Sequence, residues 1–200
     1  ADDGAFRALA DERRRMIDML RVDCIGLNGE PVTRYGYLTA SFGAAAEISY
    51  RTSASRYLKK LGGRFSYYAV TLIVTLTYQH RAIRLSVDDS DAVRLTGYTG
   101  LVCNAPNGGG GMLLAPGAEL DDGLGDLVLF KDIARRDILL QKPSWLFEGR
   151  HVDHPKVSLR RGRRFRIEAD EETLVDLDGE TIGRLPATVT VLPRALPVFA

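Results

Sequence analysis

The chain has little cysteine, almost no excess charge and no signal for export. Cys24 and Cys103 are the two cysteines among 200 residues, too few for a disulfide framework, which favours a reducing compartment. The formal net charge of +1 gives no bulk attraction to nucleic acid. The first residues lack the basic and apolar segments of a signal peptide. These absences predict a cytoplasmic protein that does not bind nucleic acid.

A long hydrophobic run is also missing. The uncharged stretch Phe65–Gln79 is too short and too polar for a transmembrane helix, because it contains Thr71, Thr75 and Thr77 among its apolar residues. The sequence leaves open that the protein acts as a peripheral protein at the inner face of the membrane. The length and the 45% share of hydrophobic residues predict one domain with a substantial core.

The first part of the chain has helical spacing, and the character changes after residue 20. Apolar residues in the range 5–20 lie on one face of a helix, with Arg13–Arg15 on the other. From Arg21 onward the pattern predicts short strands. The range 23–27 runs into Asn28-Gly29, a hairpin signal, and the range 35–41 is expected to return antiparallel. The range 53–61 predicts a helix that Gly62 ends.

The rest of the chain is dominated by turn signals between short apolar segments. The range 65–78 is ambiguous, because its residue types favour a strand and its length favours a helix. A helix interrupted by Pro143 is expected within 133–147. Strands are expected at 81–87, 97–104, 126–131, 157–159, 164–169, 173–177, 181–184 and 187–192. Many short strands at this spacing predict a mainly β protein with some α, of the antiparallel β-sandwich type.

A glycine-rich segment followed by an acidic loop is the most informative local feature. Gly108–Gly111 tolerates backbone geometry that other residues adopt at a cost, and it lacks the Lys and Ser/Thr of a phosphate-binding Walker loop. We expect it to pack closely on neighbouring strands rather than to hold phosphate. Asp121 and Asp122 follow, and the pair indicates either a simple turn or a site for a hard cation.

A second acidic loop, Asp178-Gly179-Glu180, comes between two predicted strands. Asp-Gly favours a two-residue hairpin turn. The same residues could also supply a carboxylate that accepts a proton from a hydroxyl group. Two other clusters have ordinary explanations. His151 and His154 precede Pro155 without an evident third metal ligand, which indicates a structural loop. The arginines at 160, 161, 163, 164 and 166 indicate a solvated edge strand, or contact with anionic lipid headgroups.

The two acidic loops, in this order, resemble the C-terminal half of the bacterial diacylglycerol kinase and sphingosine kinase family of lipid kinases. The similarity covers nearly the whole chain, including 21–29, Leu61-Gly62 and the closing segment 192–196. It implies a β-rich C-terminal domain at 21–200 and a helix for 65–78. One departure is the segment 37–43, where the family has Asn and Gly-x-Gly and this chain has Thr39 and Ser41.

The resemblance assigns roles to particular residues. It implies a Mg²⁺ ion held by Glu119, Asp122 and the carbonyl of Leu124. It makes Asp178 the proton acceptor, with Glu180 beside it. The implied partners are a lipid substrate, with diacylglycerol as the example, and ATP as co-substrate. The sequence does not fix the acceptor lipid or whether the protein forms homo-oligomers.

The nucleotide-binding part of these kinases is expected to be missing. Their Gly-Gly-Asp-Gly-Thr loop does not occur in this sequence, and residues 1–20 resemble the end of that N-terminal domain. We therefore expect a fragment that is inactive alone, from an enzyme that is active at full length. Two alternatives stay open. One is a non-catalytic lipid-binding or regulatory β-domain, and the other is an NAD kinase-like domain, although its Thr-Pro-Thr-Gly-Ser signature is not found.

Overall fold

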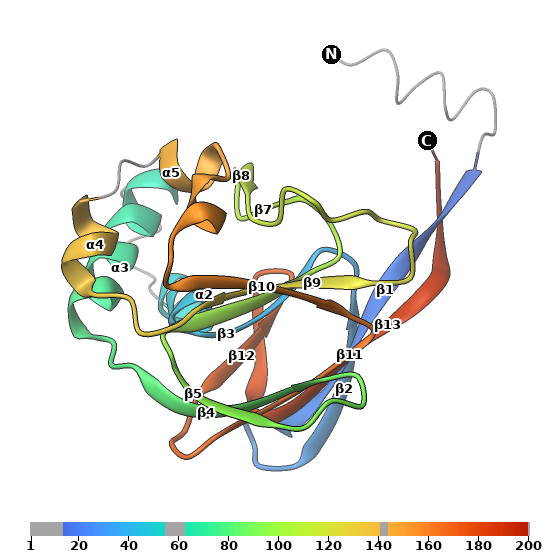
Figure 1. The fold of residues 1–200 in the computed structure, drawn as a ribbon, viewed down its shortest axis with the longest axis horizontal. Helices are drawn as coiled ribbons and strands as arrows, with labels where there is room; N and C mark the ends of the chain where they lie inside the picture. Colours follow the sequence, from blue (N-terminus) through green and yellow to red (C-terminus); the bar gives the residue numbers. More distant parts are fainter. Residues whose placement is uncertain (1–13, 55–62, 141–143, 200) are drawn as a thin grey trace.

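The protein is an antiparallel sheet that curls over an inner core, with helices against its outer face. The computed structural model describes residues 14–54, 63–140 and 144–199 (Figure 1). Its strands are β1 Arg14–Gly26, β2 Pro31–Gly36, β3 Thr39–Gly43, β4 Arg81–Val87, β5 Val93–Gly97, β6 Thr99–Cys103, β7 Asn107–Gly108, β8 Met112–Leu113, β9 Gly125–Phe130, β10 Val157–Gly162, β11 Arg164–Ala169, β12 Leu174–Leu177 and β13 Glu180–Phe199. Its helices are α2 Ala44–Ala54, α3 Gly63–Thr77, α4 Arg135–Leu140, α5 Ser144–Phe147 and the 3₁₀ turn η2 Arg150–Asp153.

The main sheet contains eleven of the described strands. Its order is β10-β9-β6-β3-β12-β13-β11-β4-β5, and β1 pairs with both β13 and β2. The pairings are antiparallel throughout. The sheet curls so that β4 approaches β10, although the two strands are far apart in the strand order. The mainly β, sandwich-like prediction is therefore confirmed.

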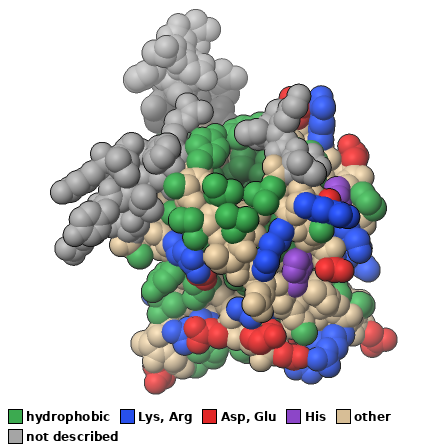
Figure 2. Space-filling view, turned by 90° about the vertical axis from the view of Figure 1, so that its left-hand side faces the viewer, with side chains coloured by type: hydrophobic (Ala, Val, Ile, Leu, Met, Phe, Trp, Pro, Cys, Tyr) green, Lys and Arg blue, Asp and Glu red, His purple; other side chains and the backbone are tan. Residues whose placement is uncertain are grey.

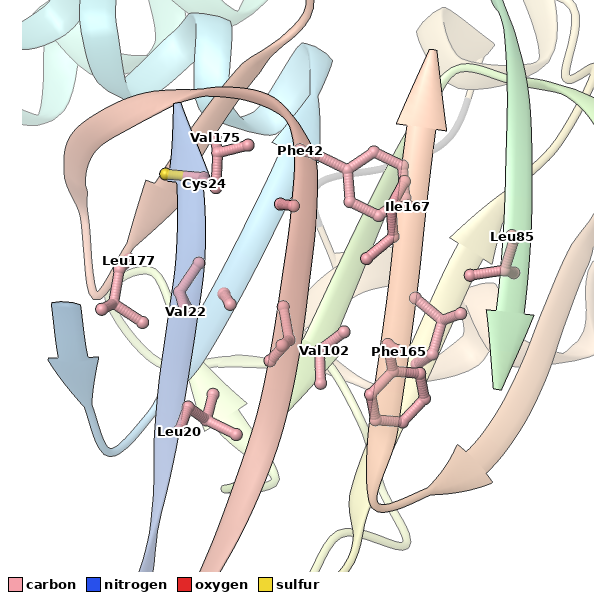
Figure 3. Packing of buried hydrophobic residues seen from close by; sticks show 14 of the residues in the cluster. Leu20, Val22, Cys24, Phe42, Leu85, Val102, Phe165, Ile167, Val175 and Leu177 are labelled. Carbon is pink, nitrogen blue, oxygen red and sulfur yellow. The ribbon is translucent and has the colours of Figure 1, made fainter. Parts of the chain in front are cut away.

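Two hydrophobic cores lie on the two faces of the sheet. The inner core includes Leu20, Val22, Phe42, Phe165 and Ile167, which come from the three strands β1, β3 and β11 and point toward one another (Figure 3). Its strands alternate between buried and outward residues, as in Leu20, Val22 and Cys24 of β1. The outer core joins β6 and β9 to the helices α2, α3 and α5. None of the described helices is long and apolar enough to cross a membrane.

The structure corrects the predicted helix at 5–20. Residues 14–20 belong to strand β1, and residues 5–13 lie outside the described ranges. The apolar residues Ile17 and Leu20 do have helical spacing, but tertiary pairing decides, because β1 pairs with β13 from Arg14 to Gly26. Figure 1 shows the two long strands side by side. The assignment of 1–20 to a missing domain stays a prediction.

Other boundaries also differ from the prediction. The return strand after Asn28-Gly29 is β2, which ends at Gly36, and β3 begins separately at Thr39. The predicted strands 181–184 and 187–192 are one continuous strand, β13. Pro186 fits within it because the register of β1 skips at this point, so no ladder donor is lost. Helix α2 occupies 44–54, and the rest of the predicted helix 53–61 lies outside the described ranges. The helix that the family resemblance implied for 65–78 is α3, which ends at Thr77.

Burial of Phe165 in the inner core predicts a large loss of stability when its ring is removed. Its side chain is fully buried. Phe165→Ala should lower the free energy of unfolding by about 3–5 kcal/mol, because it leaves a cavity as well as losing apolar contacts. Urea denaturation of the 200-residue chain measures this. Leu159→Ala, at an exposed position on β10, is the control and should change stability by only about 0.5 kcal/mol. Equal losses in both variants would contradict the assignment of the core.

Candidate functional site

The second acidic loop is a tight hairpin turn between β12 and β13. Asp178 and Gly179 are its two loop residues, and both have positive φ, 52° and 92°. Leu177 and Glu180 close the turn as a pair. These angles are those of a type I′ turn, for which Asp-Gly is a favoured sequence. The hairpin that the sequence predicts is confirmed.

The Asp178 carboxylate is occupied by backbone donors. Its Oδ2 accepts a hydrogen bond from Tyr37 N at 2.9 Å, and its Oδ1 accepts from Leu38 N at 3.0 Å and Thr39 N at 2.8 Å. The backbone N–H of Asp178 donates in turn to Thr39 O at 2.9 Å. Asp178 therefore fastens the hairpin tip to the connection between β2 and β3. Both oxygens of this carboxylate are therefore already engaged by backbone N–H groups.

Glu180 has a different environment from Asp178. It is the first residue of β13 and is exposed. Within the described ranges its carboxylate has no hydrogen-bonding or ionic partner. Of the two predicted catalytic residues, Glu180 is thus the one whose oxygens are available to a substrate. Both catalytic roles stay predictions.

Asp176 lies beneath the hairpin and is buried. Its Oδ1 accepts hydrogen bonds from Gly179 N at 3.2 Å and Ser41 Oγ at 3.4 Å, while its Oδ2 has no partner among the described residues. Burial raises the pKa of the Asp176 carboxyl, against the lowering effect of hydrogen bonds from Gly179, Ser49 and Ser41. Asp176 supports the turn at the cost of burying a titratable group.

The first acidic loop separates the roles of its two aspartates. Asp121 forms two hydrogen bonds with Arg15, at 2.8 and 3.0 Å, and this contact lowers the pKa of Asp121. Asp122 turns the other way: its Oδ1 accepts a hydrogen bond from Leu124 N at 2.9 Å, and its Oδ2 forms an ion pair with Arg161. Arg161 also lies 3.3 Å from Asp126. The sequence placed Arg161 on a solvated edge and missed this contact.

The predicted Mg²⁺ ligands have suitable chemistry but already have a cationic neighbour. Burial raises the pKa of Asp126, the nearby Arg161 opposes this, and the charges of Asp122 and Glu119 add to the rise, so the three carboxylates share one electrostatic environment. Oxygen donors of this kind are those that hard cations prefer. Arg161 would have to release one oxygen of Asp122 to a metal ion. No cluster of three or more His, Cys, Asp or Glu suited to a metal is found in the described part of the chain.

The glycine-rich segment and the histidines are structural. Gly109, Gly110 and Gly111 have positive φ between β7 and β8, and a Cβ at Gly110 or Gly111 would meet nothing within 4 Å. Gly110 and Gly111 are therefore needed for backbone conformation in an open turn. A Cβ at Gly108 would lie 2.8 Å from Leu114 Cδ1 and 3.4 Å from Thr39 Oγ1 of β3, so the close packing that the sequence predicted holds at Gly108. His151 is buried, stacks on Phe130 at 5.7 Å between ring centroids, and forms a 2.8 Å hydrogen bond with Leu114 O.

The two acidic loops are joined indirectly. No hydrogen bond or ion pair links Glu119 or Asp122 to Asp178 or Glu180 within 14–54, 63–140 and 144–199. Two buried residues without a predicted role, Asp18 and Asn104, lie between the loops. A charged residue within the apolar segment Met16–Leu20 was the available sequence signal for Asp18. A hollow of about 280 Å³ lined by Asp23, Arg166 and Pro186 includes none of the candidate residues.

Comparison with known proteins places the chain in a family. Residues 39–200 match the family described as YegS C-terminal NAD kinase beta sandwich-like domain. This match and the fold define the C-terminal domain of a bacterial lipid kinase. The chain belongs to this family, as the sequence resemblance implied.

Curated relatives and solved structures carry the same designation. Diacylglycerol kinase from Staphylococcus aureus strain JH9 is 29% identical over 178 residues, which cover 86% of this chain and 53% of the relative. Diacylglycerol kinase from Mycobacterium tuberculosis H37Rv is 29% identical over 137 residues, 68% of this chain and 44% of the relative. Two structures from Bacillus anthracis Sterne, described by the name diacylglycerol kinase, give TM-scores of 0.70 and 0.60 at 16% identity. Both alignments cover 96% of this chain. They cover 59% of the first Bacillus anthracis chain and 56% of the second. The chain thus spans about half the length of these relatives.

The raised pKa of Asp176 predicts how stability changes with pH. The folded state holds the Asp176 proton more tightly than the unfolded state, so this residue contributes stability below the unfolded pKa of about 3.9 that is lost as pH rises through the folded pKa. Asp176→Asn removes the titration and keeps a hydrogen-bond acceptor. Its Tm relative to wild type should be higher at pH 7 than at pH 4.

Thermal melts of the 200-residue chain at both pH values measure this difference. Asp89→Asn, at an exposed turn position, is the matched control and should show no such dependence. A relative Tm of Asp176→Asn that is the same at both pH values, or lower at pH 7, would contradict the account of Asp176.

Proposed function

We propose that this chain is the acceptor-lipid side of an ATP-dependent lipid kinase that phosphorylates a hydroxyl group, such as that of diacylglycerol. The family membership and the designation of the relatives support this. In such a reaction the lipid hydroxyl oxygen bonds to the γ-phosphorus of ATP, the bond to the β-phosphate oxygen breaks, and ADP leaves. The hydroxyl proton needs an acceptor. ATP would be held mainly by a part of the protein that this chain lacks.

The assignment of catalytic roles to Asp178 and Glu180 rests on one observation, which is that the Glu180 carboxylate is free to contact a substrate. Both residues are exposed, but Asp178 uses its carboxylate to hold the amides of Tyr37, Leu38 and Thr39, whereas the Glu180 carboxylate has no partner among the described residues. We therefore assign proton acceptance to Glu180 and positioning of the tip to Asp178. This revises the sequence-based expectation that Asp178 is the proton acceptor with Glu180 beside it.

The first acidic loop would hold Mg²⁺. Glu119, Asp122 and the carbonyl of Leu124 supply oxygen donors of the right kind, and the charges of Glu119 and Asp122 both act on the neighbouring Asp126. When bound, the ion supplies positive charge that offsets charge on transferring phosphate groups. Arg161, now paired with Asp122, would supply part of this charge in its absence.

A surface formed by α3 and α4 fits a peripheral membrane contact. Tyr68, Leu72, Ile73 and Leu76 recur along one side of α3 and are each about half exposed. Figure 2 shows hydrophobic side chains gathered on this side of the molecule, with Lys and Arg side chains bordering them. The exposed Arg135 and Arg136 begin the neighbouring α4. We call the exposed residues Tyr68, Leu72, Ile73, Leu76 and Leu139 the α3 face.

The threonine hydroxyls of α3 are satisfied within the helix. Thr71 Oγ1 donates to Tyr67 O, Thr75 Oγ1 to Thr71 O and Thr77 Oγ1 to Ile73 O, each at 2.8 Å. A helix whose hydroxyl groups are bonded to its own carbonyls loses little hydrogen bonding when it enters an apolar layer. We propose that the α3 face lies in the headgroup region of a bilayer, where a diacylglycerol substrate resides.

Substitutions at the hairpin tip test the proposed catalytic roles in the full-length protein. Glu180→Gln should lower kcat by about 10² or more without changing the Tm, because an exposed side chain without a partner contributes little to folding. Asp178→Asn should lower Tm and kcat together, since an amide cannot accept all three backbone donors. Lipid kinase turnover and thermal melts measure both.

Two controls sharpen the result. Glu168→Gln, exposed on β11, should retain wild-type turnover. The 200-residue chain alone should show no turnover. Wild-type turnover in Glu180→Gln would remove Glu180 from the mechanism. A full-length wild-type protein that binds lipid but does not phosphorylate it would favour a non-catalytic lipid-binding domain.

The α3 face predicts binding of the 200-residue chain to vesicles of phosphatidylcholine and phosphatidylglycerol. Leu72→Glu should lower the partition coefficient about tenfold or more, because burial of a leucine side chain contributes about 1.5–3 kcal/mol. Co-sedimentation measures the bound fraction. Leu159→Glu, equally exposed on β10, should bind as wild type does. Binding that is lost instead in Arg160→Glu/Arg166→Glu would place the membrane contact on the arginine-rich strands.

A further inference from the structure

Asp18 and Asn104 are fully buried polar residues between the two acidic loops. Burial of such groups is costly unless hydrogen bonds replace those they would make to water. Neither residue has a charged partner among the described residues. The contacts that each makes therefore indicate what its burial accomplishes.

Asp18 connects the first acidic loop to the β1–β13 pair. Its backbone N–H donates to Leu120 O at 2.6 Å, and its Oδ2 accepts from Gly123 N at 2.6 Å. Its Oδ1 accepts from Arg194 N at 2.7 Å. The pairing of β1 with β13 shifts register between Ile17 and Met19, so Asp18 lies at a bulge. Bulges redirect a side chain, and here the redirected carboxylate fastens the loop 119–124.

Asn104 connects Asp18 to the hairpin side. Its Nδ2 donates to Asp18 O and to Tyr37 O, both at 3.0 Å, and its backbone N donates to Leu38 O at 2.8 Å. An amide NH₂ has two protons, so one side chain joins two segments that are far apart in sequence. Tyr37 and Leu38 are two of the three residues whose N–H groups donate to the Asp178 carboxylate.

We propose that Asp18 and Asn104 are positioning residues that couple the first acidic loop to the hairpin tip. A continuous series of hydrogen bonds runs from Gly123 through the Asp18 carboxylate and carbonyl, the Asn104 amide and Tyr37 to Asp178. Displacement of either loop strains the other through this series. The consequence for catalysis rests on the proposed function, because Glu180 and the proposed Mg²⁺ ligands lie at the two ends.

The coupling itself can be measured in the 200-residue chain without any activity. Asp178→Ala should move the amide NMR resonance of Gly123, although the two residues share no direct contact. In an Asn104→Ala background the same substitution should leave the Gly123 resonance unmoved. Asn104→Ser serves as a second background if Asn104→Ala does not fold. A Gly123 resonance that ignores Asp178→Ala when Asn104 is present, or responds equally without it, would overturn the proposal.

The positioning role is tested by kinetics of the full-length protein. Asn104→Ala should lower kcat at least about tenfold with little change in KM for ATP, because misplacement of catalytic groups by about 1 Å can cost about 10² in rate. Ile167→Val, in the inner core, is the control for lost stability and should keep wild-type kcat below its melting temperature. Equal kcat in Asn104→Ala and wild type would overturn the positioning role. A wild-type protein without kinase activity would instead refute the proposed function and leave the NMR result standing.

Discussion

The pairing of β13 with three other strands fixes the geometry on which the rest of the structure depends. β13 pairs with β1 over most of its length and also with β11 and β12. It begins at Glu180, on the hairpin tip, and near its other end Arg194 N holds the Asp18 carboxylate. One strand therefore carries a contact to each acidic loop. Because the inner core packs against it through Ala187, Val189 and Val191, neither contact can shift independently of the core.

Buried polar residues connect this core to the surface loops. Asp18, Asn104 and Asp176 are each buried, and each has contacts that end at a turn or loop. Apolar residues of similar size would avoid the cost of desolvation. The hydrogen bonds of these three residues have defined directions, whereas apolar contacts do not. These hydrogen bonds therefore fix the positions of the loops, which hydrophobic burial alone would not determine.

Local signals in the sequence predicted the turns and much of the fold. Asn28-Gly29 and Asp178-Gly179 lie at hairpin turns, and Gly29, Asp178 and Gly179 have positive φ, which few residue types adopt readily, so the residue types are diagnostic. The sequence also identified the two acidic loops. It missed β1 at 14–20, because the spacing of Ile17 and Leu20 fits a helix and the partner strand lies about 175 residues away.

Long-range contacts account for the rest of what was missed. Local sequence cannot show that Arg161 meets Asp122, or that Asp178 uses its carboxylate to hold residues 37–39. The return strand was misplaced for the same reason, since Asp178 holds the connection that separates β2 from β3. The choice between Asp178 and Glu180 as proton acceptor therefore required the structure, although both residues were already candidates.

The most direct test of the central claim is the structure of the full-length protein with Mg²⁺ and a non-hydrolysable ATP analogue. The account predicts that the γ-phosphate faces the hairpin tip, with the Glu180 carboxylate nearer to it than that of Asp178. Asp178 should still hold the amides of residues 37–39. A γ-phosphate directed away from the tip, or an Asp178 carboxylate released from those amides and turned toward the phosphate, would contradict it.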